Sequence, residues 1–316
     1  MPEGLPTSPY PGVNPSSRVW IMQVQEGKAP EAWEQFADSL LQREAVLCRI
    51  HDGRLPRDVP GMYVDNADVD SILSQLPGLN GFSGPRGGEI RAALDPLVEN
   101  ARVRLESAMS QWQSGLSPLS PMARIVLGSK LSLQDLEAFA VVASVERNPS
   151  RQRLNIYLQD NVHHSMPTVN LIRRLLGSEA SLDPDGPLVS NGLVEFSGDG
   201  SWATLTVSLP RRVAWFLNGS ESLDTDLPPN TTILSASSTQ DQTSASDDRV
   251  LLVTGSDVSE RRSAATNRYG TLIISPEPAE PEQWRALVRE AALQQAAVFL
   301  ELGDHLTPPV AERLRR

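Results

Sequence analysis

The sequence predicts a multidomain protein of the α+β and α/β classes, helical in its first half and alternating between strand and helix at its end. Three observations support this fold class. Apolar residues recur at intervals of three and four within several segments of residues 31–176, which is typical of amphipathic helices. Two short runs, 193–196 and 202–207, flank a turn and indicate a β-hairpin. After residue 248, short apolar runs alternate with helical segments, as in an α/β layer.

Length and charge restrict the functions that are open to the chain. Its 316 residues suggest about two domains of ordinary size. A net charge of −11 argues against electrostatic capture of nucleic acid or of an anionic membrane. Cys48 is the single cysteine, so no intrachain disulfide can form, and we expect a buried, inert thiol in a reducing, cytoplasmic setting. The start of the chain shows no signal peptide, and no apolar run is long enough to span a membrane.

The first 118 residues divide into two expected regions. Residues 1–17 are rich in proline, glycine and serine and should be disordered. Residues 18–118 form a helical region, in which segments 31–48 and 95–113 pair as a helical hairpin. Asp95 precedes a proline and is expected to cap the second helix, and a shorter helix is expected at 66–76. The packing seam of the second helix consists of Val98, Ala101, Leu105, Ala108 and Trp112.

Residues 119–218 have the element order of a winged-helix domain, a variant of the helix-turn-helix. After a short helix at 122–127, helices are expected at 131–145, 151–161 and 169–176, and the β-hairpin and a last helix at 210–217 follow them. Local capping signals support these boundaries. Ser132 and Asp135 can cap the helix after 131, while Thr168 can cap the helix that Gly177 ends.

The remainder of the chain predicts a linker and an incomplete α/β core. Residues 219–248 are rich in Ser, Thr, Asp and Gln without an apolar period, which favours a flexible linker. Residues 249–316 then predict a partial, P-loop-like core in a doubly wound arrangement. Its strands are expected at 249–254, 271–275 and 296–301, its helices from about Ala264, at 281–294 and from 307 onward.

The turn after the strand at 249–254 has the outline of a P-loop without its phosphate-binding residues. A P-loop needs G-x-x-x-x-G-K-[ST] at this point, so that bare amides and a lysine hold the phosphates. Gly255 matches the first glycine. Glu260 stands at the second glycine, Arg261 at the lysine and Arg262 at the hydroxyl that binds Mg²⁺. An acid at this position repels phosphate, so we expect a degenerate Walker A motif.

The strand at 296–301 predicts an equally degenerate Walker B motif. Glu301 can stand in for the aspartate that ends such a strand, but Leu302 occupies the position of the acid that polarises water. Spacing alone favours a plainer interpretation, in which two parallel core strands carry no nucleotide site. In either case we expect no catalytic residue, and ATP with Mg²⁺ binds only if the degenerate P-loop retains affinity.

Other candidate residues have stronger structural explanations. His163 and His164 diverge by roughly 100° on a helix and lack further ligands, so no metal site is expected. No G-x-S-x-G nucleophile elbow is present. Arginines on and near the helix at 169–176 suggest contacts with DNA phosphates, but the acidic chain favours protein contacts instead. These arginines are Arg151, Arg153, Arg173, Arg174, Arg211 and Arg212.

At several motifs the chain resembles large bacterial AAA-type ATPases that carry an N-terminal winged-helix domain. Some of these ATPases are encoded beside phage-tail-like contractile injection systems. The resemblance extends from about residue 31 to the C-terminus. The matching motifs are Gly61-Met-Tyr-Val64 with Asp68-Val-Asp70, Leu131-Ser-Leu-Gln-Asp-Leu-Glu137, Tyr157-Leu-Gln-Asp160 with Pro167-Thr-Val169, Leu193-Val194 with Arg212-Val-Ala-Trp-Phe-Leu217, and the segment after Arg249.

The resemblance implies a regulatory N-terminal region followed by part of a first, inactive AAA module. The chain ends soon after Glu301, so the sensor, arginine-finger and lid elements of such a module cannot all be present. The partners implied are proteins, including AAA subunits in a ring. Three hypotheses remain open: a non-catalytic adaptor with a pseudo-ATPase core, a part of an active ATPase whose working module lies elsewhere, and a winged-helix DNA-binding regulator.

Overall fold

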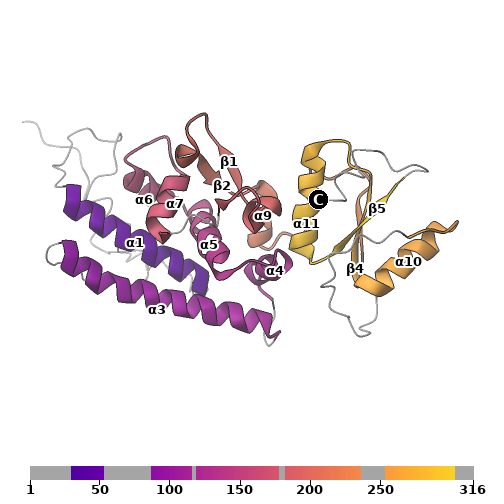
Figure 1. The fold of residues 1–316 in the computed structure, drawn as a ribbon, viewed down its shortest axis with the longest axis horizontal. Coiled ribbons are helices and arrows are strands. Elements are labelled where there is room, and N and C mark those ends of the chain that lie inside the picture. Colours follow the sequence, from indigo (N-terminus) through magenta and orange to yellow (C-terminus); the bar gives the residue numbers. More distant parts are fainter. Residues whose placement is uncertain (1–29, 53–86, 116–118, 178–181, 236–252, 303–316) are drawn as a thin grey trace, which may run out of the picture. The chain divides into compact units, whose positions relative to one another are not determined.

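The computed structural model describes residues 30–52, 87–115, 119–177, 182–235 and 253–302 (Figure 1). Over this part the protein is of the α+β class, mostly helical with two small sheets. The described residues from Glu31 onward belong to one compact unit. The expected disordered segment 1–17, the helix at 66–76 and the helix start at 307 lie outside the described residues. No helix within the described ranges is both long and apolar enough to cross a membrane.

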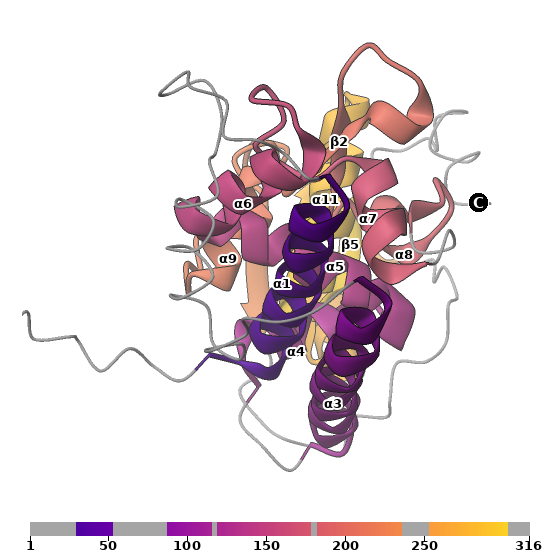
Figure 2. The same cartoon turned by 90° about the vertical axis from the view of Figure 1, so that its left-hand side faces the viewer.

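The helical hairpin is confirmed. Helix α1 (Ala32–Asp52) lies beside α3 (Gly87–Gln113), as Figures 1 and 2 both show. The predicted seam residues Val98, Ala101 and Leu105 are buried in the main core.

The predicted start of α3 is wrong. The helix begins at Gly87, so Asp95 does not cap it and Pro96 lies inside it. A proline inside a helix removes one backbone hydrogen bond. Asp95 and Pro96 both lie on the exposed face, where water can bind the carbonyl that loses its partner.

Four predicted helices follow, and side chains within a few residues of their starts cap them. They are α4 (Pro121–Gly128), α5 (Leu133–Arg147), α6 (Pro149–Gln159) and α7 (Val169–Leu176). Ser132 and Asp135 form the expected capping box of α5, and Thr168 caps α7. Gly177 ends α7 with a φ of 70°, a conformation that glycine adopts without strain.

Helix α5 is the centre of the main core. Every residue from 135 to 145 is buried. Helices α1, α6, α7 and α9 (Arg211–Leu217) and strand β2 (Thr206–Ser208) all pack against it. This enclosure explains its nearly continuous apolar sequence, because a helix that is buried on all sides needs no polar face.

The predicted β-hairpin is confirmed, but its strands are shorter than expected. Strands β1 (Glu195–Ser197) and β2 (Thr206–Ser208) pair antiparallel with Phe196 opposite Val207. Helix α9 (Arg211–Leu217) follows as predicted, whereas the one-turn helix α8 (Pro187–Ser190) had no clear sequence signal. A bridge between Thr168 and Thr206 joins the start of α7 to β2.

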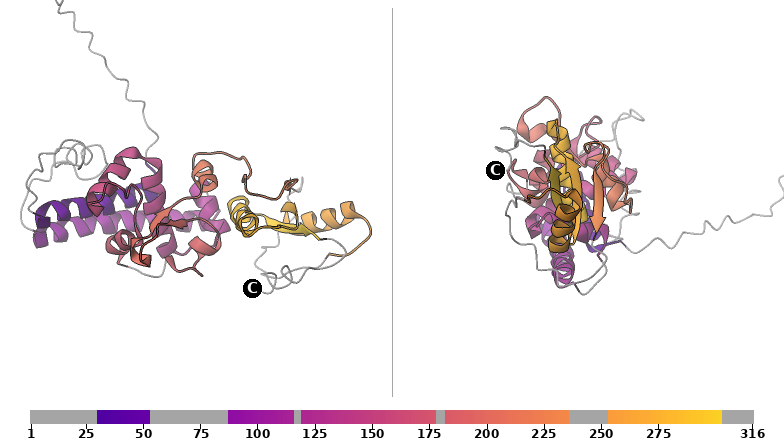
Figure 3. Two further views of the ribbon diagram at one scale, coloured as in Figure 1. Left: turned by 90° about the horizontal axis from the view of Figure 1, so that it is seen from above. Right: turned by 90° about the vertical axis from the view of Figure 1, so that its right-hand side faces the viewer.

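The second sheet contains β3 (Thr232–Ser235), β4 (Thr271–Pro276) and β5 (Ala297–Glu301) in that order. Strand β4 is parallel to β5 and antiparallel to β3. Helices α10 (Val258–Tyr269) and α11 (Pro281–Gln294) contact β4 and β5 from opposite faces (Figures 1 and 3).

This sheet differs from the predicted one. Strand β3 lies within residues 219–248, where a linker was expected. Its side chains are exposed, and it forms a strand because its backbone pairs with that of β4. The expected strand at 249–254 falls mostly outside the described residues, and residues 253–254 are not in a strand. Among the described strands there is one parallel pair, in a mixed sheet, instead of a doubly wound parallel layer.

Helix α4 and helix α11 approach each other closely at Gly128. A Cβ atom at this position would overlap the backbone carbonyl of Ala292. Leu293 of α11 is fully buried and belongs to the same core cluster as α5. The second sheet, α10 and α11 are here called the α/β part. The main core therefore extends from the helices of residues 32–217 to α11 of the α/β part.

We expect the substitution Gly128→Ala to destabilise the fold by about 1–3 kcal/mol, because the added methyl group forces α4 and α11 apart. Hydrogen exchange of α11 amides and thermal unfolding would measure the effect. Gly115→Ala is the control. A Cβ atom at Gly115 would meet open space, but the φ of this residue is positive, so the substitution should strain only the end of α3. Equal exchange in α11 for both variants would contradict this explanation.

Candidate functional site

The candidate site lies where α10 begins and β5 ends, and Asp257 defines the helix start. Its carboxylate accepts hydrogen bonds from the backbone N–H of Ser259 at 2.7 Å and of Glu260 at 3.4 Å. It also accepts one from the Ser259 hydroxyl at 2.6 Å. Because of this cap, α10 begins at Val258. The expectation that the helix would begin near Ala264 is wrong.

The early start of α10 changes what Gly255 and Glu260 can do. Only Ser256 and Asp257 separate Gly255 from the helix, so the chain there is too short to form the wide loop of a P-loop. The amides that would face a phosphate already bind the carboxylate of Asp257. The first turn of α10 thus carries its own anion.

Gly255 retains a role in the geometry of this turn. Its φ of 153° lies in a region that residues with a Cβ rarely adopt. The carbonyl of Gly255 accepts a hydrogen bond from the guanidinium of Arg261. Arg261, predicted at the position of the P-loop lysine, therefore turns back onto its own loop.

Arg262 and Glu301 form an ion pair between α10 and β5. The Arg262 Nε and Nη2 atoms donate to Glu301 Oε1 at 2.9 and 2.5 Å. Both side chains are about one third exposed, at 37% and 35%. Glu301 is the last residue of β5, as expected, and Leu302 follows it half-buried. The structure thus brings together two residues that were placed in separate motifs, one in Walker A and one in Walker B.

Three of the six arginines considered for DNA contact form ion pairs within the chain. Arg151 forms a buried pair with Asp38 at 2.6 Å, and Arg212 forms one with Glu290 at 2.7 Å. Arg174 of α7 lies 2.8 Å from Glu44 of α1. A guanidinium that is already paired with a carboxylate has little charge to offer a phosphate.

Two further features surround α7. The guanidinium of Arg173 lies 5.6 Å from the ring centre of Trp202, which is 41% exposed. The His164 ring contacts the Thr206 hydroxyl at 3.3 Å and so helps to hold the loop before α7 against β2.

Within the described residues, no three His, Cys, Asp or Glu side chains are grouped as a metal site would require.

Asp257 is the residue that the sequence interpretation missed. The run Asp257-Val-Ser-Glu260 fits the N-terminal helix signature of a capping residue followed three positions later by glutamate. That signal was available, but the comparison with a P-loop assigned the same residues to a loop.

The hydrogen bonds from Ser259 and Glu260 hold the pKa of Asp257 below its ordinary value. Because the pKa is lower in the folded state, the capping contribution is present above the ordinary value of about 3.9 and is lost as the pH falls through the folded pKa. We expect the Ser259 amide to lose protection from hydrogen exchange as the Asp257 carboxylate becomes protonated. In Asp257→Asn the side-chain amide oxygen caps the helix without ionising, so protection of the Ser259 amide should not follow the protonation of a carboxylate. NMR between about pH 2 and 6 would test this, and identical titration in both proteins would contradict it.

Comparison of the chain with protein-family models, with curated proteins and with solved structures found no match.

Proposed function

We propose that the chain is a non-catalytic interaction protein, the N-terminal regulatory region of an AAA-type ATPase. In this proposal residues 119–218 are a winged-helix domain that contacts partner proteins or substrates. Residues 249–316 are a degenerate AAA core that no longer uses nucleotide.

The ion pair between Arg262 and Glu301 is the observation that carries the proposal. In a working P-loop enzyme these two positions supply oxygen ligands to Mg²⁺. Here a guanidinium occupies one position and binds the carboxylate at the other. A cation fixed within 2.9 Å of the remaining carboxylate competes with a metal ion and repels it.

The occupied amides of α10 support the same conclusion. Phosphate binding at a helix start depends on N–H groups that lack an intrahelical partner. The carboxylate of Asp257 binds two of these groups, and its negative charge faces the place of a phosphate. Nucleotide binding would require this cap to break and the resulting charge repulsion to be overcome.

The order of α5, α6, α7 and the hairpin β1–β2 supports the winged-helix assignment. Protein contact is favoured over DNA contact for two reasons. The chain has a net charge of −11, and Arg151, Arg174 and Arg212 are paired with carboxylates of the same chain. The electrostatic attraction that provides nonspecific DNA affinity is therefore weak.

Titration with a fluorescent ATP analogue, with and without Mg²⁺, tests the proposal. We expect a Kd weaker than about 1 mM, equivalent to roughly −4 kcal/mol, in both conditions and no ATP turnover. Glu301→Gln is the matched variant. In a working site it would remove the effect of Mg²⁺, whereas here it should leave nucleotide affinity unchanged. The proposal would be contradicted by micromolar binding of Mg·ATP that is lost in Glu301→Gln, or by any ATP turnover.

A further inference from the structure

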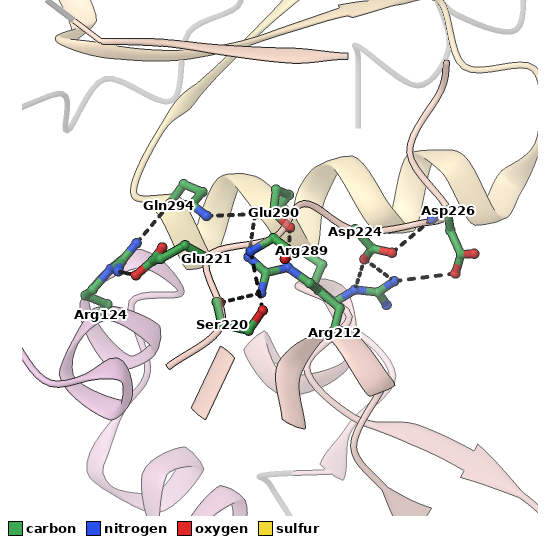
Figure 4. A network of polar contacts seen from close by, with 10 residues as sticks. Arg124, Arg212, Ser220, Glu221, Asp224, Asp226, Arg289, Glu290 and Gln294 are labelled. Atoms are coloured by element: carbon green, nitrogen blue, oxygen red, sulfur yellow. Dashed lines mark hydrogen bonds and ion pairs between the residues drawn. The ribbon is translucent and has the colours of Figure 1, made fainter. Parts of the chain in front are cut away.

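A polar network joins helix α11 to helices α4 and α9 (Figure 4). At its centre, Arg212 of α9 binds Glu290 of α11 through two parallel hydrogen bonds of 2.8 and 2.7 Å. The two side chains are 2% and 0% exposed. This fork geometry is the strongest arrangement that a guanidinium and a carboxylate form.

A second buried pair lies one residue away on α11. The Arg289 Nε donates to Asp224 Oδ2 at 2.7 Å, and the Nη2 atom lies 2.6 Å from the same oxygen. Asp224 is 3% exposed, although it lies in the segment that was expected to be a flexible linker. Asp226 also faces Arg289, at 3.9 Å.

Residues 220–226, here called the strap, supply acceptors to arginines of three helices. The Ser220 carbonyl accepts from Arg212 at 3.1 Å, and Glu221 pairs with Arg124 of α4 at 2.8 Å. Arg124 also donates to Gln294 of α11 at 2.9 Å. Figure 4 shows these side chains pointing toward one another from α4, α9, α11 and the strap.

Glu290 accepts hydrogen bonds from two different residues of the network. Gln294 donates to Glu290 at 2.8 Å, so the same carboxylate is bound from its own helix and from α9. Two guanidinium groups contact the ring of Phe216, with Arg124 at 4.6 Å and Arg212 at 5.2 Å from its centre. The arginines are thus held by ring contacts as well as by carboxylates.

The α/β part has only a small core of its own. Among the described residues, one apolar cluster has Ala265, Leu272 and Ile274 as buried members. Ile273 of β4 and Ala286 and Leu287 of α11 are buried too, so α11 supplies part of this core. A core of this size contributes little toward holding a sheet folded in isolation. Leu293 instead belongs to the main core, next to the charged network.

From these observations we propose that the strap and the pairs Arg212–Glu290 and Arg289–Asp224 form a conformational lock. The lock holds α11 against α9 and α4, and the three-stranded sheet stays folded only while α11 is docked. Release of the lock opens α11, β4 and β5 as one unit and leaves the helices around α5 folded. This inference is independent of the proposed function, since it concerns a mechanical link and not nucleotide binding.

The test is native-state hydrogen exchange of the full chain, measured at increasing urea concentration. In the wild-type protein, amides of β4 and β5 should exchange in the same cooperative opening as those of α5. In Glu290→Gln the fork loses its charge and Arg212 is left buried without a counter-ion. We expect exchange in β4 and β5 to become roughly a hundredfold faster, with α5 unchanged.

Two further variants make the result decisive. Asp224→Asn breaks the second pair and should also release β4 and β5, even if Glu290→Gln expresses poorly. Glu282→Gln is the control, because Glu282 lies on α11 outside the network, is 66% exposed and pairs with Arg285 of the same helix, and such pairs contribute little; its exchange should match the wild type. The proposal is overturned if wild-type β4 and β5 already open separately, if Glu290→Gln and Asp224→Asn leave them protected, or if α5 loses protection together with them.

Discussion

The fork between Arg212 and Glu290 is the interaction on which the arrangement of the α/β part depends. Both groups are removed from water, and an isolated buried charge is far more costly than a paired one. Each side chain therefore requires the other helix to be in place. Helix α11 also contributes Leu293 to the main core, so this helix joins the sheet to the helical part by charged and by apolar contacts.

The same device recurs elsewhere in the chain. Asp38 of α1 and Arg151 of α6 form a second buried fork, at 2.6 and 2.8 Å. Burial raises the pKa of Asp38, and the hydrogen bond and charge of Arg151 oppose that rise. Only two of the 28 basic residues in the sequence are lysines. Arginine suits such sites because its planar group binds a carboxylate at two points and stays charged.

The candidate site follows a similar principle on a smaller scale. Asp257 occupies the amides of α10, and Arg262 occupies the carboxylate of Glu301. The groups that would bind phosphate and metal in a nucleotide site are satisfied within the protein. The sequence interpretation placed Arg262 and Glu301 in two separate motifs, and only the structure shows that they form a pair. The interpretation placed the helix start wrongly, because it assigned the capping signal of Asp257 to a loop.

The sequence by itself determined the elements whose signals are local. Periodicity and caps within a few residues specify α5, α7 and α11, and the boundaries of α7 and α11 match the prediction. Tertiary structure decided the rest. Strand β3 exists because β4 offers it a ladder, and the partners Asp38 and Arg151 lie 113 positions apart, Arg212 and Glu290 78 apart. No local pattern records such pairs, since burial of a charge becomes costly only when distant segments enclose it.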